Sequence, residues 1–319
     1  MFRIISLRNG VSPILELKVL GVGETLMKNK KELKLIRFLK LLFVLLDLIR
    51  FPKYFSRFSR MDFDNWQLFA LLVLRQKCGR SYDEFCFVWL PALTPVLNFL
   101  GLEKIPEPST LRKFGRRLKA RWAHLALGSC VHLAFVDEVI AGIDGTGISS
   151  RRGCMHYYKR IGQKVKKKDF LKVVGVADMT TQIVTTIKVR KKERHDNVDF
   201  ASQMRKTRKV IRIKRGLGDR GFDAEKNHIV MEELGAEFIA PLKNKDVPVH
   251  RTKGVHRKKL KRYFPKKKYH QRSKKETIWF VVKDKYGKFV KSIVFHTQKI
   301  EILMRFLAYN LDRLIILGF

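Results

Sequence analysis

Three acidic residues of this chain have neighbours that would let their carboxylates act together. Asp144 lies in AGIDGTGI at the end of an apolar run, and Asp219 lies between glycines in GLGDRGFDAE. Glu276 lies in YHQRSKKETIWFVVK, just after the most basic part of the chain. Strand ends, a tight glycine turn and an inward helix face can bring three carboxylates together. Such a cluster repels itself unless a cation intervenes. Its oxygens suit Mg²⁺, and two such ions can catalyse phosphodiester chemistry.

Glu276 is flanked along the chain by hydrogen-bond donors and cations at offsets that fit one face of a helix. Tyr269, Arg272 and Lys283 lie at offsets of minus seven, minus four and plus seven from it. On a single helix these four residues fall within an arc of about 60° and along about 21 Å of the axis. The helix would then present one acid in the middle of a row of cations. A plain salt bridge between Glu276 and Arg272 is the alternative, and it would be only weakly stabilising.

The elements that must position these residues can be read from the period of the apolar residues. EVIAGIDGTGI, FLKVVGVADMTTQIVTTIKVR and AEFIAPL are rich in β-branched residues, and the second contains a turn at Asp178 to Gln182. NVDFASQMRKTRKV and DAEKNHIVMEEL are typical of helices. The predicted order is strand, strand, strand, helix, strand, helix, strand. This order indicates an α/β fold that opens with an antiparallel meander.

The first 130 residues are predicted to be helical. The most hydrophobic run, residues 41–46, is too short to span a membrane and is typical of a helix packed on others. Pro108 begins a helix in PEPSTLRKFGRRLKARWAHLAL, which we expect to continue to Trp122. That helix could bind phosphates or be a solvated face. The cations that it carries are Arg112, Lys113, Arg116, Arg117, Lys119 and Arg121.

The charge of the chain predicts a polyanionic partner. Its 319 residues hold 68 Lys and Arg against 29 Asp and Glu, a net charge of +39. Nucleic acid is the first candidate for the partner and an anionic membrane surface is the second. Residues 243–275 form a basic insert with fifteen Lys or Arg and one acid, Asp246. Its place directly before Glu276 favours a surface for DNA phosphates over a solvated loop.

Several other patterns are interpreted as structural. GLGDRG matches a dinucleotide-binding motif, but Asp219 would repel a pyrophosphate, so we interpret it as a tight turn and expect no nucleotide cofactor. Asp137, Glu138 and Asp223 are interpreted as surface acids. Trp279 could stack on a flipped base, and packing in the core is favoured. The four cysteines contain no C-x-x-C pair and are interpreted as buried thiols in a reducing compartment.

Three motifs together resemble the DDE transposases of bacterial and archaeal insertion sequences. They are IDGTG, GDRGFD and Tyr269-x2-Arg272-x3-Glu276-x6-Lys283, the last matching the Y-R-E-K motif of that family at all four positions. The closing EILMRFLAYNLDRLI also resembles the tail of the family's domain. The resemblance covers about residues 100–319. One departure is IKRGLG before Asp219, where that family has an apolar strand.

The resemblance implies an RNase H-like mixed sheet flanked by helices and preceded by a helical region. The expected division is an N-terminal helical extension at 1–60, a helical DNA-binding region at 61–130 and a catalytic domain at 135–319. Asp144, Asp219 and Glu276 would be the catalytic residues and the ligands of two Mg²⁺ or Mn²⁺ ions.

The same resemblance implies that Tyr269, Arg272 and Lys283 lie near the DNA at the element end. The expected activity is metal-dependent cleavage at element ends followed by strand transfer into target DNA. Two ends must be brought together, so a dimer or larger assembly on double-stranded DNA is expected. The expected location is cytoplasmic and nucleoid-associated, with no membrane partner. A nuclease or resolvase that cuts without strand transfer, and an inactive DNA-binding copy, are the alternatives.

Overall fold

The N-terminal part of the chain is helical, as predicted. A computed structural model describes residues 32–150, 160, 162, 170–191, 195–244 and 246–319, so most of the predicted extension at 1–60 lies outside the described residues. The helices are α3 Lys34–Leu48, α4 Asn65–Cys78, α5 Tyr82–Glu84, the π-helix η1 Phe85–Trp89, α6 Thr94–Leu100, α7 Pro108–Arg117 and α8 Ala120–Leu133. Within the described part of the chain, no helix combines the length and the apolar character needed to cross a bilayer.

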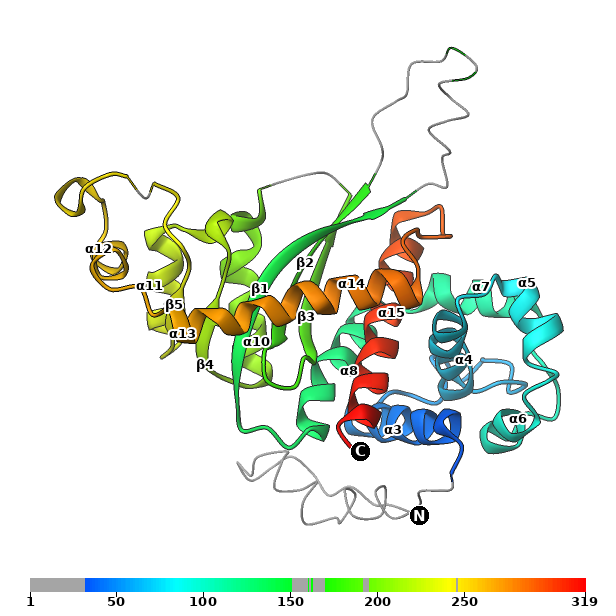
Figure 1. The fold of residues 1–319 in the computed structure, drawn as a ribbon. Helices are drawn as coiled ribbons and strands as arrows, with labels where there is room; N and C mark the ends of the chain where they lie inside the picture. The colour runs from blue at the N-terminus through cyan, green and yellow to red at the C-terminus, as the bar shows by residue number, and fades with distance from the viewer. Residues whose placement is uncertain (1–31, 151–159, 161, 163–169, 192–194, 245) are drawn as a thin grey trace.

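A five-stranded mixed sheet follows the helices (Figure 1). Its strands are β1 Glu138–Ser149, β2 Phe170–Asp178, β3 Val184–Arg190, β4 Arg212–Leu217 and β5 Glu237–Ile239. The spatial order is β3-β2-β1-β4-β5, in which β2 is antiparallel to β1 and β3, whereas β4 is parallel to β1 and β5. The predicted fold class and the opening meander are therefore confirmed.

Helices connect and cover the strands. Between β3 and β5 lie η2 Asp196–Asp199, α10 Phe200–Val210, η3 Arg220–Phe222 and α11 Glu225–Glu233. After β5 come η4 Val249–Arg251, α12 Val255–Arg262, α13 Lys266–Tyr269, η5 His270–Ser273, α14 Lys274–Tyr286 and α15 Phe295–Ile316. In Figure 1, α14 crosses the near face of the sheet, while α12 and α7 lie toward opposite ends of the molecule.

The turn between β2 and β3 is fixed by the buried carboxylate of Asp178. This carboxylate accepts hydrogen bonds from the backbone N–H and the hydroxyl of Thr181, at 2.7 and 2.8 Å. It also accepts from the backbone N–H of Ile140 at 3.0 Å, which ties the turn to β1. The turn predicted from the sequence is confirmed, and the acid within it is part of the framework of the sheet.

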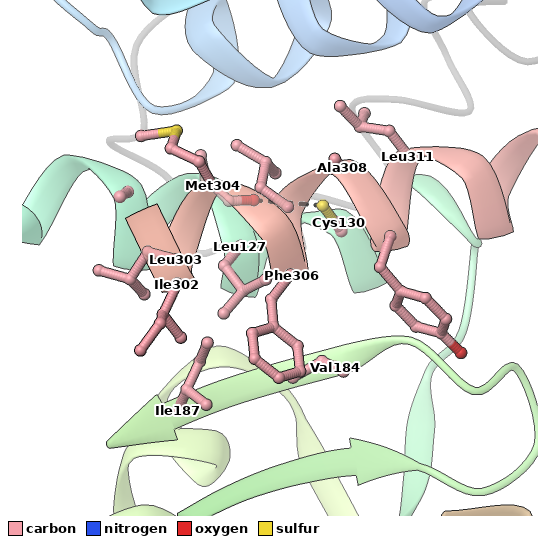
Figure 2. Packing of buried hydrophobic residues seen from close by; sticks show 14 of the residues in the cluster. Leu127, Cys130, Val184, Ile187, Ile302, Leu303, Met304, Phe306, Ala308 and Leu311 are labelled. Carbon is pink, nitrogen blue, oxygen red and sulfur yellow. Dashed lines mark hydrogen bonds between the residues drawn. The ribbon is translucent and has the colours of Figure 1, made fainter. Parts of the chain in front are cut away.

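The C-terminal helix α15 forms the centre of the hydrophobic core. Figure 2 shows it beside α8, with Phe306 pointing toward β3. Asn310 of α15 is buried and pairs with the backbone of Val184, accepting from its N–H at 2.9 Å and donating to its carbonyl at 2.8 Å. These bonds satisfy part of the edge strand, which would otherwise offer unpaired backbone groups. Cys86 and Cys130 are buried and Cys78 is half-buried, whereas Cys154 lies outside the described residues.

The basic helix that begins at Pro108 is shorter than predicted. It ends at Arg117 because Leu118 takes an extended conformation, and α8 begins at Ala120. The carbonyl of Leu118 accepts a hydrogen bond from the ring of His296, at 3.1 Å. The predicted single helix to Trp122 is therefore wrong, since this tertiary contact uses a carbonyl that a continuous helix would have bonded internally.

One ion pair lies fully inside the core. Arg305 and Glu301 of α15 pair at 2.5 Å, and each side chain is 2% exposed. Glu301 also accepts from the backbone N–H groups of Lys291 and Ser292, at 2.9 Å each. Burial alone would raise the pKa of Glu301, but the charge of Arg305 and these hydrogen bonds hold it below the ordinary value. The carboxylate therefore stays charged and fixes the segment after α14.

Replacing Glu301 by Ala should lower the free energy of unfolding by about 3–5 kcal/mol, because Arg305 would be left charged and buried without its partner. Urea denaturation followed by circular dichroism measures this change. Glu233→Ala is the matched control, since Glu233 pairs with Arg205 while both side chains are 53% exposed, and it should cost less than about 1 kcal/mol. Equal losses in the two variants would contradict the structural role of the buried pair.

Candidate active site

Asp144 lies within the central strand β1, which continues to Ser149 beyond the apolar run that ends at this residue. Strand β1 stays paired with β2 as far as Ser149, but its parallel pairing with β4 ends at Gly142 opposite Leu217. Asp144 therefore lies two residues beyond the last β1–β4 pair. Its Oδ1 accepts from the backbone N–H of Gly145 at 2.8 Å, and its Oδ2 accepts from Nε1 of Trp279 at 3.1 Å.

Asp219 occupies the equivalent place on the neighbouring strand. The basic stretch before it forms β4 in spite of its charge, and Asp219 lies two residues beyond Leu217. Adjacent strands lie about 4.8 Å apart, so the two aspartates lie at the same edge, where the β1–β4 pairing ends. The Asp219 carboxylate accepts from the backbone N–H of Gly221 at 2.8 Å and caps η3. The interpretation of GLGDRG as a tight turn that displays Asp219 is confirmed.

The row formed by Tyr269, Arg272, Glu276 and Lys283 lies on three helical segments and not on one helix. Tyr269 ends α13, Arg272 lies in the 3-10 segment η5, and Glu276 and Lys283 lie on α14. A 3-10 turn winds more tightly than an α-helix, so the angles expected for a uniform helix do not apply across η5. Arg272 Nη1 lies 3.4 Å from Glu276 Oε1, and the Glu276 side chain is 69% exposed.

The two ends of this row approach different aspartates. Burial lowers the pKa of Lys283, while the nearby charge of Asp144 acts in the opposite direction. Burial also raises the pKa of Tyr269, where the charge of Arg272 lowers it and that of Asp219 raises it. The row thus extends from the neighbourhood of Asp219 to that of Asp144, across the edge at which the β1–β4 pairing ends.

The three carboxylates are not gathered into a cation-holding cluster. Across the ranges that the structure describes, no group of three or more His, Cys, Asp and Glu side chains is arranged so that it could hold a metal ion. Glu276 points its carboxylate toward Arg272, in the pairing that the sequence analysis raised as the alternative. The structure therefore brings Asp144 together with Trp279 and the Lys283 end of the row, and leaves Glu276 turned toward solvent.

Trp279 has a contact that sequence reasoning missed. Its side chain is 6% exposed and meets Phe306 edge to face at 5.3 Å, so the expected core packing is confirmed. Its indole N–H, however, donates to Asp144. The ring lies over Gly175, where a Cβ would come within 3.0 Å of it. The spacing from Glu276 could have indicated this contact, because Trp279 lies three residues after Glu276 and so near the same face of α14.

Asp223 was wrongly interpreted as a surface acid. Its side chain is fully buried and accepts two hydrogen bonds from the guanidinium of Arg257, at 2.8 and 2.9 Å. It also accepts from the backbone N–H of Lys243 at 2.8 Å. These partners come from the basic insert, 20 and 34 residues further along the chain. No local pattern in the sequence could have indicated them.

Four of the cations for which DNA binding was considered lie on α7, away from the row. Arg112, Lys113, Arg116 and Arg117 are all exposed, whereas Leu111 and Phe114 of the same helix are buried. Arg112 pairs with Asp83 at 2.7 Å, so part of its charge is already balanced. Figure 1 shows α7 among the N-terminal helices, beyond the end of α14 that carries Lys283.

Comparison with known families gives the geometry its context. The model of the transposase DDE domain family matches residues 137–311, which is more than half of the chain. The chain belongs to this family. Its five-stranded mixed sheet with flanking helices is accordingly RNase H-like.

Two other comparisons add little to the family match. A crystal structure of a pre-cleavage Mos1 transpososome is similar at 11% identity over 84% of this chain and 81% of that chain, with a TM-score of 0.23. A likeness that weak carries no argument. No curated protein matches the chain.

Glu276→Gln should change the free energy of unfolding by less than about 0.5 kcal/mol, because an exposed i, i+4 ion pair stabilises a helix only that much. Thermal unfolding of the purified variant measures the effect. Asp178→Asn is the control for a buried acid, and it should cost about 1–3 kcal/mol because two donors of Thr181 and one of Ile140 lose a charged acceptor. A large loss of stability in Glu276→Gln would mean that its side chain is part of the framework.

Proposed function

We propose that the protein is a DNA transposase that cleaves element ends and transfers the freed strands into target DNA. The observation that carries this proposal is the equal offset of Asp144 and Asp219 beyond the last β1–β4 pair, at an edge crossed by the Tyr269–Lys283 row. Membership of the transposase DDE domain family supports the reaction class.

The donor chemistry of the candidate site fits divalent cations. Asp144, Asp219 and Glu276 would hold two Mg²⁺ or Mn²⁺ ions, since all three supply carboxylate oxygens. Asp144 and Asp219 accept from neutral N–H groups, and their oxygens keep further lone pairs. Glu276 would have to turn from Arg272, and the 3.4 Å contact of an exposed side chain opposes that movement only weakly. Ions bound there would stabilise both the attacking and the leaving oxygen of a phosphodiester exchange.

The side chains of the row would orient the substrate. Arg272 and Lys283 are cations beside the acids and can contact phosphate oxygens on either side of the bond to be cut. Trp279 donates to Oδ2 of Asp144 and so limits the rotation of that carboxylate. In the reaction, water breaks the phosphodiester at the element end and leaves a 3′-OH. That 3′-OH then attacks a target phosphate and displaces the 3′-oxygen of the target strand.

The exposed cations of α7 would contact the DNA backbone at a distance from the reacting bond. Lys113, Arg116 and Arg117 can neutralise phosphates, whereas Arg112 is shared with Asp83. Binding of this kind weakens steeply as salt is added. Since cleavage and joining need two ends in one complex, we expect a dimer or larger assembly on double-stranded DNA. The expected location, cytoplasmic and nucleoid-associated, follows from that substrate.

A strand-transfer assay with labelled element-end DNA and Mg²⁺ tests the proposed activity. We expect joined product from the wild-type chain and none after EDTA is added. Glu276→Gln should bind the DNA with unchanged affinity but give neither cleaved nor joined product. Nicks without joining would favour a nuclease or resolvase, and binding alone would favour an inactive copy. Full activity of Glu276→Gln would refute its proposed role.

Trp279→Phe should weaken Mn²⁺ binding by about 10- to 100-fold, the usual effect of losing a hydrogen bond that orients a ligand. Titration of Mn²⁺ followed by electron paramagnetic resonance measures this affinity without DNA or turnover. Trp89→Phe is the control, because Trp89 is half-buried on η1 and packs against Arg80 instead of the candidate site. Unchanged Mn²⁺ affinity in Trp279→Phe would exclude a positioning role for this residue.

A further inference from the structure

The basic insert is folded and anchored, although its composition is that of a solvated loop. We refer to residues 246–268 as the basic arm; they contain η4, α12 and the start of α13. Helix α12 has no buried residue of its own. A segment with so many like charges has little tendency to fold by itself. Contacts with the rest of the protein therefore have to hold the arm in place.

The first anchor is the buried carboxylate of Asp223. Its side chain is fully buried and takes the guanidinium of Arg257 in a two-point contact. The hydrogen bond to Asp223 raises the pKa of Arg257, so the guanidinium stays charged. Breaking a buried pair is far more costly than breaking an exposed one. This contact fixes the first turn of α12 to the end of the sheet.

The second anchor is Glu225, at the start of α11. Its two carboxylate oxygens accept from the backbone N–H groups of His256 and Arg257, at 2.9 and 3.2 Å, and so cap the N-terminus of α12. Gly254 makes this possible, because its φ is 94° and a Cβ there would come within 2.0 Å of Glu225. The rings of His228 and His256 also lie parallel, 5.5 Å apart. Three different contacts thus join α12 to α11.

Most of the other cations of the arm are exposed, although Lys258 is half-buried and Lys268 lies 3.5 Å from Glu237. Arg257 is used by the first anchor, and Lys261 donates to the carbonyl of Asn244 at 3.1 Å. The exposed cations are Arg251, Lys253, Lys259, Arg262, Lys266, Lys267 and Lys268. Like charges held this close together repel one another, and a polyanion lying against them would relieve that repulsion. Duplex DNA is the partner that this charge pattern fits, since regularly spaced phosphates can contact several of these side chains at once.

The anchor also joins the arm to the candidate site. Asp219 and Asp223 lie at the two ends of η3, so the turn that displays one candidate ligand also holds Arg257. At its other end the arm leads through Tyr269 into the row that contains Glu276. We infer that the basic arm binds the phosphates of duplex DNA beside the cleaved bond, and that Asp223 is the positioning residue that sets the arm relative to Asp219. This inference rests on the proposed function for the identity of the DNA.

Binding of end DNA at several salt concentrations tests the arm. Lys259→Ala with Arg262→Ala should reduce the slope of log affinity against log salt by about 1.8, because each lost phosphate contact contributes about 0.9. Arg208→Ala with Lys209→Ala is the matched control. Both of these residues are exposed on α10, which follows η2. The control should leave the slope unchanged, because α10 begins directly after η2, and η2 lies against Gly145 on the face of the sheet opposite to α14.

The role of Asp223 is tested in combination with the arm variant. In Asp223→Asn, removing Lys259 and Arg262 should no longer change the salt slope by the full amount, because the arm is not held in place. If Asp223→Asn does not fold, Arg257→Lys serves instead, since it keeps the charge but loses the two-point contact. Equal slopes for the arm variant and the α10 control would overturn DNA binding by the arm. A full change of slope in the anchor variants would overturn the role of Asp223. Binding through the arm without any joined product would count against the proposed function alone.

Discussion

The candidate site depends on the point at which the parallel pairing of β1 and β4 stops. Beyond Gly142 and Leu217 the two strands separate, and each carries an aspartate two residues further on. Because β1 remains paired with β2 to Ser149, Asp144 stays on a rigid strand although it has lost its neighbour on the other side. Asp219 instead enters a turn, where capping of η3 fixes its carboxylate. One break in pairing therefore produces two acids at a common edge, with different backbone conformations.

Helix α14 can cover this edge because its middle and its C-terminal end are held. Near the site, Trp279 lies against Gly175, the residue of β2 that pairs with Asp144, and a larger residue at 175 would displace the indole. At the far end, the hydroxyl of Tyr286 donates to Asp312 at 2.6 Å, and Lys285 and Lys77 also pair with this acid. Asp312 thus joins α14 to α15 and α4. The exposed Glu276 in the first turn of α14 is left with the greater freedom to move.

The sequence predicted those features that depend on local patterns. The alternation of β-branched residues indicated the strands, and the glycines around Asp219 indicated its turn. Tertiary contacts decided what was missed. The basic helix ends at Arg117 because the carbonyl of Leu118 bonds to His296, which is 178 residues away. Asp223 is buried by partners from the basic insert, and no spacing in the chain reveals that pairing.

The acids of the core and those of the proposed cation site have different partners. Several buried acids are neutralised by cations, as Asp223 is by Arg257, Asp312 by two lysines and Glu301 by Arg305. Asp144 and Asp219 instead accept hydrogen bonds from neutral N–H groups. Neutral donors orient a carboxylate without forming an ion pair with it, so the printed hydrogen bonds leave the charge of these two acids uncancelled. In a protein with a net charge of +39, that local exception is what would let divalent cations and a polyanion occupy neighbouring surfaces.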